Sequence, residues 1–225
     1  MDVSPYQGWP SDKIDNLWTE MYQGTRWSQR ELVVAISNTI KKKKKTDGLS
    51  VHISSLEHET LVNKTERIPL PGFQSEYLMG VDVFHQLHCL NMLRKALYPG
   101  RYPASSLKTR DGKKVNYGNW LHMDHCIESL RQSLTCQADT SPNTFRWLPD
   151  TKILVPSLGT VHMCRNFSKI QKWTAARFVD IDAATRRKHV EANGEIVDYG
   201  NEPNPEVAPH AGDAPEGWRV NLDDL

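Results

Sequence analysis

The chain has 225 residues, with 28 Lys and Arg against 27 Asp and Glu, and its net charge of +1 lacks the basic excess of a general nucleic-acid binder. No stretch approaches the roughly 20 apolar residues that span a bilayer, and the N-terminus carries no signal-peptide pattern. The hydrophobic fraction of 38% can fill a core, so the length fits one generous domain or two small ones.

The first part of the chain predicts two helices followed by a short β element. Ser11 is placed to cap an amphipathic helix that runs through Ile14, Trp18 and Met21. A second helix is predicted over residues 27–42. The lysine run at 41–45 indicates a solvated linker, with contact to an anionic membrane surface as the alternative. Residues 50–70 favour one or two short strands, and residues 69–72 favour a turn.

The rest of the chain centres on two more helices. One is predicted over residues 80–97 and the other over residues 120–134, with Asn119 as the N-cap of the latter. A loop at 139–149, a short helix or irregular segment within 161–178 and one or two helical turns at 182–189 follow. We therefore predict a mainly α fold: a single helical domain over residues 1–193, with two central helices, a small β element and long irregular loops. Residues 194–225 are predicted to form an extended tail.

The two central helices carry one motif twice. His85-Gln-Leu-His88-Cys89 recurs as His122-Met-Asp-His125-Cys126, 37 positions later. Positions i and i+3 of a helix lie about 60° apart, so each histidine pair can reach one ion. Imidazole-rich ligation with few carboxylates favours copper or zinc over magnesium or calcium. The C-x-x-C spacing of zinc fingers and the H-E-x-x-H of thermolysin-like proteases are both missing.

Each cysteine of the doubled motif lies between its histidines and an apolar stripe. If the helices pack by these stripes, the four histidines line one shared cleft. Cys89 and Cys126 then lie near the helix contact, either joined as a disulfide or kept as thiols that act as ligands. The stripes are Leu87, Leu90, Leu93 and Leu97 on the first helix, and Met123, Ile127, Leu130 and Leu134 on the second.

A third group of candidate residues follows the second motif. His162 is a candidate ligand or proton-transfer group, and the alternative is a structural histidine beside a disulfide cysteine. Cys136 and Cys164 are candidate partners for that disulfide. Asp139 is either an acceptor for a ligand imidazole or a turn cap.

The residues around both motifs resemble a known family. The segment Val83-Phe-His-Gln-Leu-His-Cys-Leu-Asn-Met-Leu-Arg94 and the pattern His122-x-x-His-Cys-x-x-x-Leu-Arg131 are similar to the signature motifs of the UstYa-like proteins of fungal secondary metabolism. Members carry one membrane helix ahead of this region, and the chain begins where a lumenal domain would begin. The resemblance implies oxidative cyclisation, hydroxylation or halogenation, with copper in some members and cyclisation without net oxidation in others.

We therefore expect a copper-dependent oxidative tailoring enzyme with molecular oxygen as co-substrate. His85, His88, His122 and His125 would be both metal ligands and catalytic residues, and His162 a further catalytic residue. The alternatives are a non-redox cyclase that uses the same histidines as general acids and bases, and a scaffold with a structural metal site. We expect a small-molecule or peptide intermediate as substrate and no nucleic acid as partner. A homo-oligomer and partner enzymes of the same pathway fit the resemblance. The expected location is the secretory lumen, or a membrane if an anchor precedes the domain, and otherwise the chain is soluble.

Overall fold

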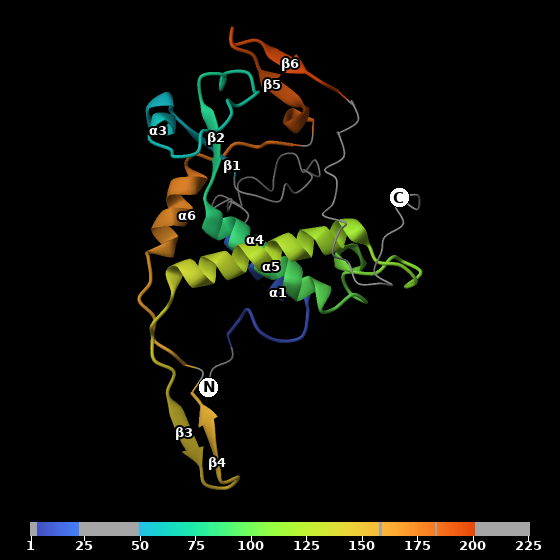
Figure 1. Ribbon diagram of the computed structural model, residues 1–225, viewed down its shortest axis with the longest axis vertical. Coiled ribbons are helices and arrows are strands. Elements are labelled where there is room, and N and C mark those ends of the chain that lie inside the picture. The colour runs from blue at the N-terminus through green and yellow to red at the C-terminus, as the bar shows by residue number, and fades with distance from the viewer. Residues whose placement is uncertain (1–3, 23–49, 158, 183, 201–225) are drawn as a thin grey trace, which may run out of the picture.

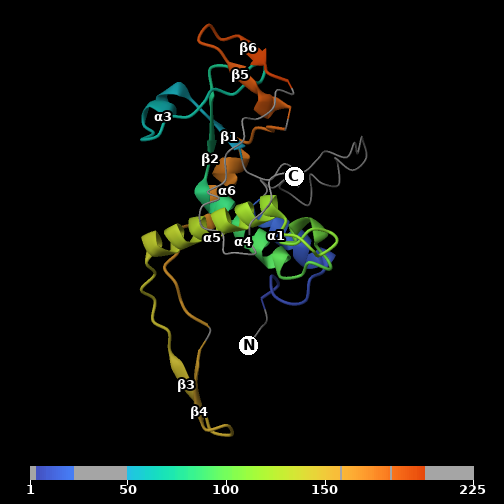
Figure 2. The same ribbon diagram turned by 45° about the vertical axis from the view of Figure 1, so that its right-hand side comes forward.

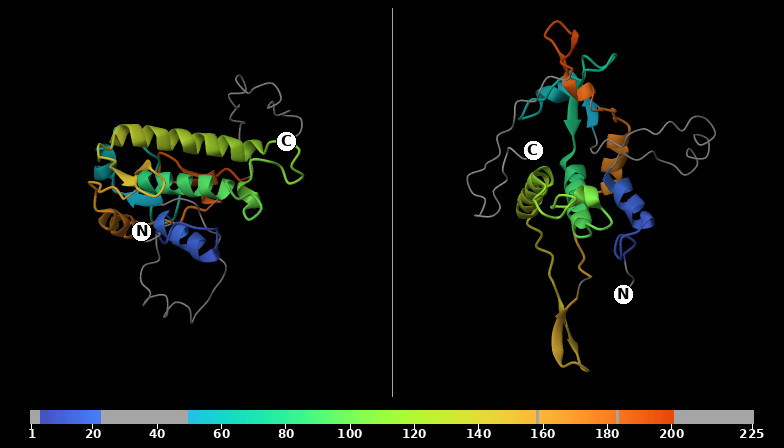
Figure 3. Two further views of the ribbon diagram at one scale, coloured as in Figure 1. Left: turned by 90° about the horizontal axis from the view of Figure 1, so that it is seen from below. Right: turned by 90° about the vertical axis from the view of Figure 1, so that its right-hand side faces the viewer.

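Three helices form the centre of the molecule. The computed structural model describes residues 4–22, 50–157, 159–182 and 184–200, so the predicted helix at 27–42, the lysine run and the tail beyond residue 200 lie outside the described residues. The central helices are α1 (Asp12–Tyr22), α4 (Asp82–Ala96) and α5 (Tyr117–Gln137), and α4 lies between the other two (Figure 3). The prediction of a mainly helical fold is confirmed.

Small sheets and short helices surround this centre (Figure 1). Within the described residues, three antiparallel strand pairs occur: β1 (Ser50–Ile53) with β2 (Tyr77–Gly80), β3 (Phe145–Leu148) with β4 (Ile153–Pro156), and β5 (Lys188–Val190) with β6 (Ile196–Asp198). The remaining elements are α3 (Ser55–Glu59), η1 (Pro103–Ser105), α6 (Phe167–Ala175) and η2 (Thr185–Arg187). None of the helices in these described ranges is long and apolar enough to cross a membrane.

Side-chain caps set the starts of α1 and α5. Ser11 Oγ accepts a hydrogen bond from the Ile14 amide at 3.3 Å, which confirms the predicted cap of α1. The predicted cap of α5 is wrong by three residues, because Asn116 accepts from the Asn119 amide at 3.2 Å and the helix begins at Tyr117. The Asn119 side chain instead donates to the carbonyls of Ala104 and Ser106, at 2.9 and 2.7 Å. Asn119 therefore fixes α5 to the loop before it.

The predicted leucine stripes do not form the contact between the two motif helices. Leu97 and Leu134 are 76% and 72% exposed, and Ile127 is 56% exposed. A disulfide joins Cys89 and Cys126 instead, both of them fully buried, with their Cα atoms 4.9 Å apart. Because the cysteines face each other, the helices meet on the cysteine and histidine side of the motif. The ends of the stripes are exposed, whereas Met123 is 3% exposed and Leu87 packs against the buried cluster of Tyr22 and Phe84.

Two buried clusters support the centre. Tyr22 and Phe84 join α1 to α4, and Phe167 and Ile170 of α6 pack against them. A second cluster under the β1–β2 sheet contains Ile68, Val179 and Ile181, with Leu70, Phe73 and Leu78 packed around it. The start of α4 is therefore held between α1 and α6, which fixes the orientation of its histidines.

The prediction of one or two short strands within residues 50–70 is confirmed by β1, whereas the predicted loop at 139–149 and the predicted tail each contain a strand that was not expected. Residues 61 and 62 are not in a strand, and Val62 is 98% exposed. The partner of β1 is β2, which precedes α4, and only its last residue, Gly80, lies within the helix predicted over residues 80–97. The predicted loop at 139–149 contains β3, and the predicted tail contains β6 at 196–198. These strands have three or four residues each, too few for alternation to identify them.

Candidate metal centre

The two central helices bring the four motif histidines together as two pairs, each with one histidine from either helix. His85 Nε2 lies 3.3 Å from His125 Nε2, and His88 Nε2 lies 3.4 Å from His122 Nε2. The helices run antiparallel, because the lower number on α4 meets the higher number on α5. All four predicted ligands thus gather at one helix contact, beside the Cys89–Cys126 disulfide.

The geometry of each pair fits a metal ion. Two nitrogens bound to one ion at about 2.0–2.1 Å in tetrahedral geometry lie about 3.3–3.4 Å apart. Hydrogen bonds from nitrogen donors are usually shorter, about 2.9–3.0 Å. In the part of the chain that the structure describes, no three His, Cys, Asp or Glu side chains gather around one point. Each pair therefore offers two imidazoles, one fewer than the three protein ligands usual in a catalytic zinc site. Imidazole donors suit copper or zinc.

Polar groups on both helices face the second ring nitrogen of His85. Its Nδ1 lies 3.6 Å from Asp82 Oδ1 and 3.5 Å from Ser129 Oγ. Acceptors at this nitrogen keep a proton on Nδ1 and leave Nε2 as the donor to a metal. Neither Asp82 nor Ser129 stood out in the sequence. Their spacing is the available signal, since Asp82 lies three residues before His85 and Ser129 lies four residues after His125.

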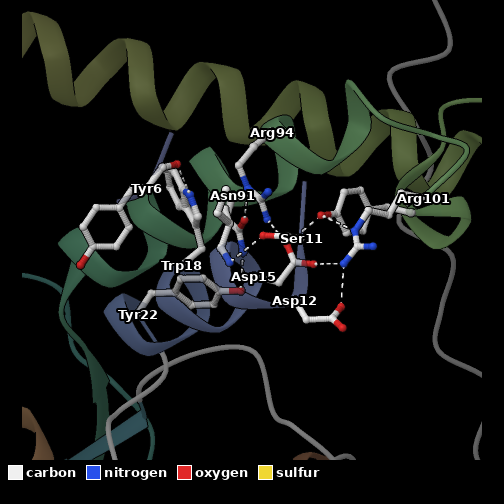
Figure 4. A network of polar contacts seen from close by, with 11 residues as sticks. Tyr6, Ser11, Asp12, Asp15, Trp18, Tyr22, Asn91, Arg94 and Arg101 are labelled. Atoms are coloured by element: carbon white, nitrogen blue, oxygen red, sulfur yellow. Dashed lines mark hydrogen bonds and ion pairs between the residues drawn. The ribbon is translucent and has the colours of Figure 1, made fainter. Parts of the chain in front are cut away.

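The ring of His88, the next histidine of the motif, is held in place by α1. His88 is 7% exposed, and its ring packs edge to face on Tyr22 with 5.5 Å between centroids. The Tyr22 hydroxyl accepts a hydrogen bond from the fully buried Asn91 at 2.9 Å. Asn91 in turn accepts from Arg94 Nε at 2.9 Å, and Arg94 donates to Asp15 at 2.6 Å. Figure 4 shows that this chain of contacts runs along the interface of α1 and α4.

Asp15 is the main anion of this network. It also accepts from the Tyr102 hydroxyl at 2.7 Å and from Arg101 at 3.2 Å. Burial alone would raise the pKa of its carboxyl, but the hydrogen bonds from Arg94, Tyr102 and Arg101 outweigh burial and lower the pKa below 3.8. The Arg94 guanidinium also stacks over the Trp18 ring, 5.5 Å from its centroid. The network therefore fixes α1 on α4 directly behind His88.

Replacing Asp15 with asparagine should destabilise the fold clearly. The Arg94 side chain is 14% exposed, and the loss of its counter-charge should cost about 2–3 kcal/mol in free energy of unfolding. Asp12→Asn is the matched control: it lies on the same helix, its side chain is 97% exposed, and it pairs only with the outer Arg101. Its expected cost is about 0–1 kcal/mol.

Urea unfolding at pH 7 would measure both variants. Equal losses for Asp15→Asn and Asp12→Asn would contradict the network. Since the folded pKa of Asp15 is lowered, the contribution of the carboxylate is complete above pH 3.8 and lost as the pH falls further through the folded pKa.

A cavity of about 750 Å³ opens beside the α4 histidines. Its walls come from β2, the start of α4 and the segment 61–65, and both His85 and His88 contribute to them. His122 and His125 do not line it. The cavity did not follow from the sequence, because its wall joins segment 61–65 to the start of α4 through β2, and most of β2 lies outside the predicted elements.

The third group of candidate residues lies near the points where the β3–β4 hairpin joins the rest of the chain. This hairpin stands away from the helices (Figure 2). His162 Nδ1 lies 2.5 Å from Asp139 Oδ2, so Asp139 accepts from His162 rather than from one of the four paired histidines. Hydrogen bonds from Ser141, and then the contact with His162, lower the pKa of the Asp139 carboxyl to about 2. Cys136 and Cys164 are free and exposed, so their predicted pairing is wrong. The catalytic role of His162 stays a prediction.

Comparisons with known proteins agree with the motif. Residues 1–177 match the protein family described as "Mycotoxin biosynthesis protein UstYa". The UstYa family oxidase phomYc of Diaporthe leptostromiformis is 30% identical over 184 residues, which are 81% of this chain and 62% of that protein. The UstYa family oxidase aprY of Aspergillus flavus is 36% identical over 113 residues, 48% of this chain and 33% of that protein.

A third relative is named as a transacylase and not as an oxidase. The transacylase cctO of Talaromyces islandicus is 36% identical over 134 residues, 53% of this chain and 43% of that protein. The chain spans between 33% and 62% of the length of these three relatives. No solved structure matches the chain.

Proposed function

The chain belongs to the UstYa family of mycotoxin biosynthesis proteins, and from that premise we propose that it is a copper-dependent oxidase that tailors an intermediate of fungal secondary metabolism. The observation that carries the proposal is the pairing of the four motif histidines at 3.3 and 3.4 Å between Nε2 atoms. The oxidase names of the relatives phomYc and aprY support it. Bound copper supplies redox chemistry with molecular oxygen as co-substrate, which imidazoles alone lack.

The protein's own groups have separate tasks in this proposal. The Nε2 atoms of the two pairs would bind copper. Asp82 and Ser129 orient the imidazole of His85 through its Nδ1. Tyr22 fixes the ring of His88 from behind. The Cys89–Cys126 disulfide holds the two helices at the distance that both pairs require.

A second candidate function is group transfer or cyclisation without oxidation. The similarity to a transacylase favours it, because neutral imidazoles at a cavity wall suit general acid and base catalysis near neutral pH. The histidines are then proton carriers rather than ligands. Copper binding separates the two functions.

We place the protein in the lumen of the secretory pathway. A fully buried disulfide between α4 and α5 supports this location, because disulfides persist in oxidising compartments and are rare in the cytosol.

The test is metal analysis of protein prepared without a histidine tag. After copper loading and dialysis against a weak chelator, we expect bound copper and an electron paramagnetic resonance spectrum with nitrogen couplings. A variant with all four motif histidines changed to alanine should lose both signals. No retained copper in the wild-type chain, or equal retention in the variant, would sink the copper proposal and favour acid–base chemistry.

A further inference from the structure

The cavity beside the α4 histidines has the size and position of a substrate site. Its volume of about 750 Å³ lies within the range of about 300–1,000 Å³ that is usual for small-molecule sites. Only the α4 member of each histidine pair lines it. A molecule in the cavity therefore reaches His85 and His88 from one side, while His122 and His125 approach the same imidazoles from α5.

Most of the wall is apolar. Aliphatic, thioether and aromatic side chains come from the three segments that enclose it, namely Leu61, Val62, Leu78, Met79, Val81 and Phe84. Contact of these groups with an apolar ligand removes area from water at about 25 cal/mol per Å². The wall therefore favours a ligand with a large apolar surface.

The charged groups of the wall disfavour an anion. The Lys64 ammonium has three hydrogen-bond donors, and it donates to the His58 carbonyl, the Glu59 carbonyl and Glu59 Oε2, at 3.3, 2.9 and 3.2 Å. Its donors are occupied and its charge is compensated by Glu59. The other charged lining side chain, Asp82, is an anion beside His85. A carboxylate or phosphate in the cavity would meet the negative charge of Asp82, and the Lys64 charge is already paired with Glu59.

The exposed edge of β2 adds neutral backbone hydrogen-bonding groups to the wall. On β2, the Leu78 amide donates to the Glu66 carbonyl, and the Leu78 carbonyl accepts from Thr65 Oγ1. The backbone N–H and C=O of Leu78 therefore point away from β1. Gly80, two residues further along the same strand, points its N–H and C=O the same way, and it lines the cavity without a side chain to cover them. This edge suits a neutral amide or hydroxyl group.

We propose that this cavity binds a largely apolar substrate without an anionic group and presents it to His85 and His88. As a substrate site it rests on the proposed function, whereas the binding itself does not depend on copper. The charge selectivity follows from the Lys64–Glu59 pair and from Asp82.

Three fluorescent probes with the same ring system test the binding: neutral dansylamide, the anionic 5-dimethylaminonaphthalene-1-sulfonate and the cationic dansylcadaverine. We expect dansylamide to bind at least about tenfold more tightly than the anion, a difference of about 1.4 kcal/mol. Tighter binding of the anion than of dansylamide or dansylcadaverine would overturn the proposal, as would the absence of dansylamide binding.

Variants locate the probe. Leu61→Asp adds an anion to the wall and should weaken dansylamide binding at least about fivefold. Leu56→Asp is the matched control: it changes an 80% exposed leucine on α3 outside the cavity and should leave binding unchanged. Glu59→Gln leaves the Lys64 charge uncompensated and should strengthen binding of the anionic probe about threefold. Equal effects of Leu61→Asp and Leu56→Asp would place the probe elsewhere and overturn the proposal.

Copper binding separates a failure of this site from a failure of the proposed function. Leu61→Asp should bind copper as the wild-type chain does, because it keeps all four motif histidines and the Cys89–Cys126 disulfide. A chain that binds dansylamide with the expected selectivity but no copper supports the cavity and contradicts the oxidase. A chain that binds copper but not dansylamide supports the oxidase and contradicts the proposed binding site in the cavity.

Discussion

Changing His88 to alanine should lower copper affinity at least about 100-fold, the largest effect that we expect from any single substitution. Loss of an outer partner of a metal-binding histidine typically costs 10–100-fold, and the loss of a direct ligand exceeds that. The substitution removes one of the two imidazoles of the pair, which the 3.4 Å contact between the Nε2 atoms of His88 and His122 defines. The pair then offers a metal one bond instead of two.

The same pairing predicts how substitutions combine. His122→Ala added to His88→Ala should cost little more, since both disrupt one pair. His85→Ala added to His88→Ala should remove the second pair and abolish tight binding. Residues that act as one unit show such non-additivity, whereas independent residues add. A competition titration against a chromophoric chelator would measure each affinity, and circular dichroism would confirm that each variant folds.

His189→Ala is the control for a general effect of histidine removal. His189 is on β5, about half exposed, and 4.0 Å from Glu66. The His189→Ala variant should bind copper as the wild-type chain does. Additive losses from His88→Ala and His122→Ala, or an equal loss from His189→Ala, would contradict the two-pair arrangement.

The sequence predicted the histidines of this site well because helix geometry links them locally. A spacing of three residues places His85 with His88, and His122 with His125, on one face of each helix. The duplication of the motif then indicated that the two faces meet. The family resemblance, which the comparison over residues 1–177 confirms, rests on the same residues.

The face on which the helices pack was beyond local reasoning. A leucine stripe and a cysteine face compete for the same interface, and the sequence pattern alone favoured the stripe. The disulfide, with 4.9 Å between its Cα atoms, places the cysteine faces of the two helices in contact. Leu97 and Leu134 are left exposed. Periodicity identifies an apolar face, but a covalent link between two helices overrides it.

The groups around the histidines depend on contacts that are distant in the chain. Arg94 meets Asp15 across 79 positions and Asn91 meets Tyr22 across 69. The cavity wall joins segment 61–65 to α4 through β2, a strand of four residues. Neither composition nor spacing encodes such pairings, so the network and the cavity became visible only in the folded chain.

Removal of the Cys89–Cys126 disulfide should cost the most stability of any change considered. A bridge that spans 37 positions restricts the unfolded chain by about 4 kcal/mol in the chain-entropy description. We therefore expect Cys89→Ala with Cys126→Ala to lower the midpoint of thermal unfolding by roughly 10 °C, at about 2–4 °C per kcal/mol for a chain of this size. Differential scanning calorimetry would measure the shift.

The same double variant should also weaken copper binding, although it keeps every histidine, because the two helices then lose the link that sets the Nε2–Nε2 distances. Cys136→Ala with Cys164→Ala is the matched control, since both thiols are free and exposed, and it should change stability by no more than about 0.5 kcal/mol. A comparable loss in both double variants would contradict a structural role specific to Cys89–Cys126. A loss of stability with unchanged copper affinity would show that α1, α6 and the buried clusters hold the histidine pairs in register without the bridge.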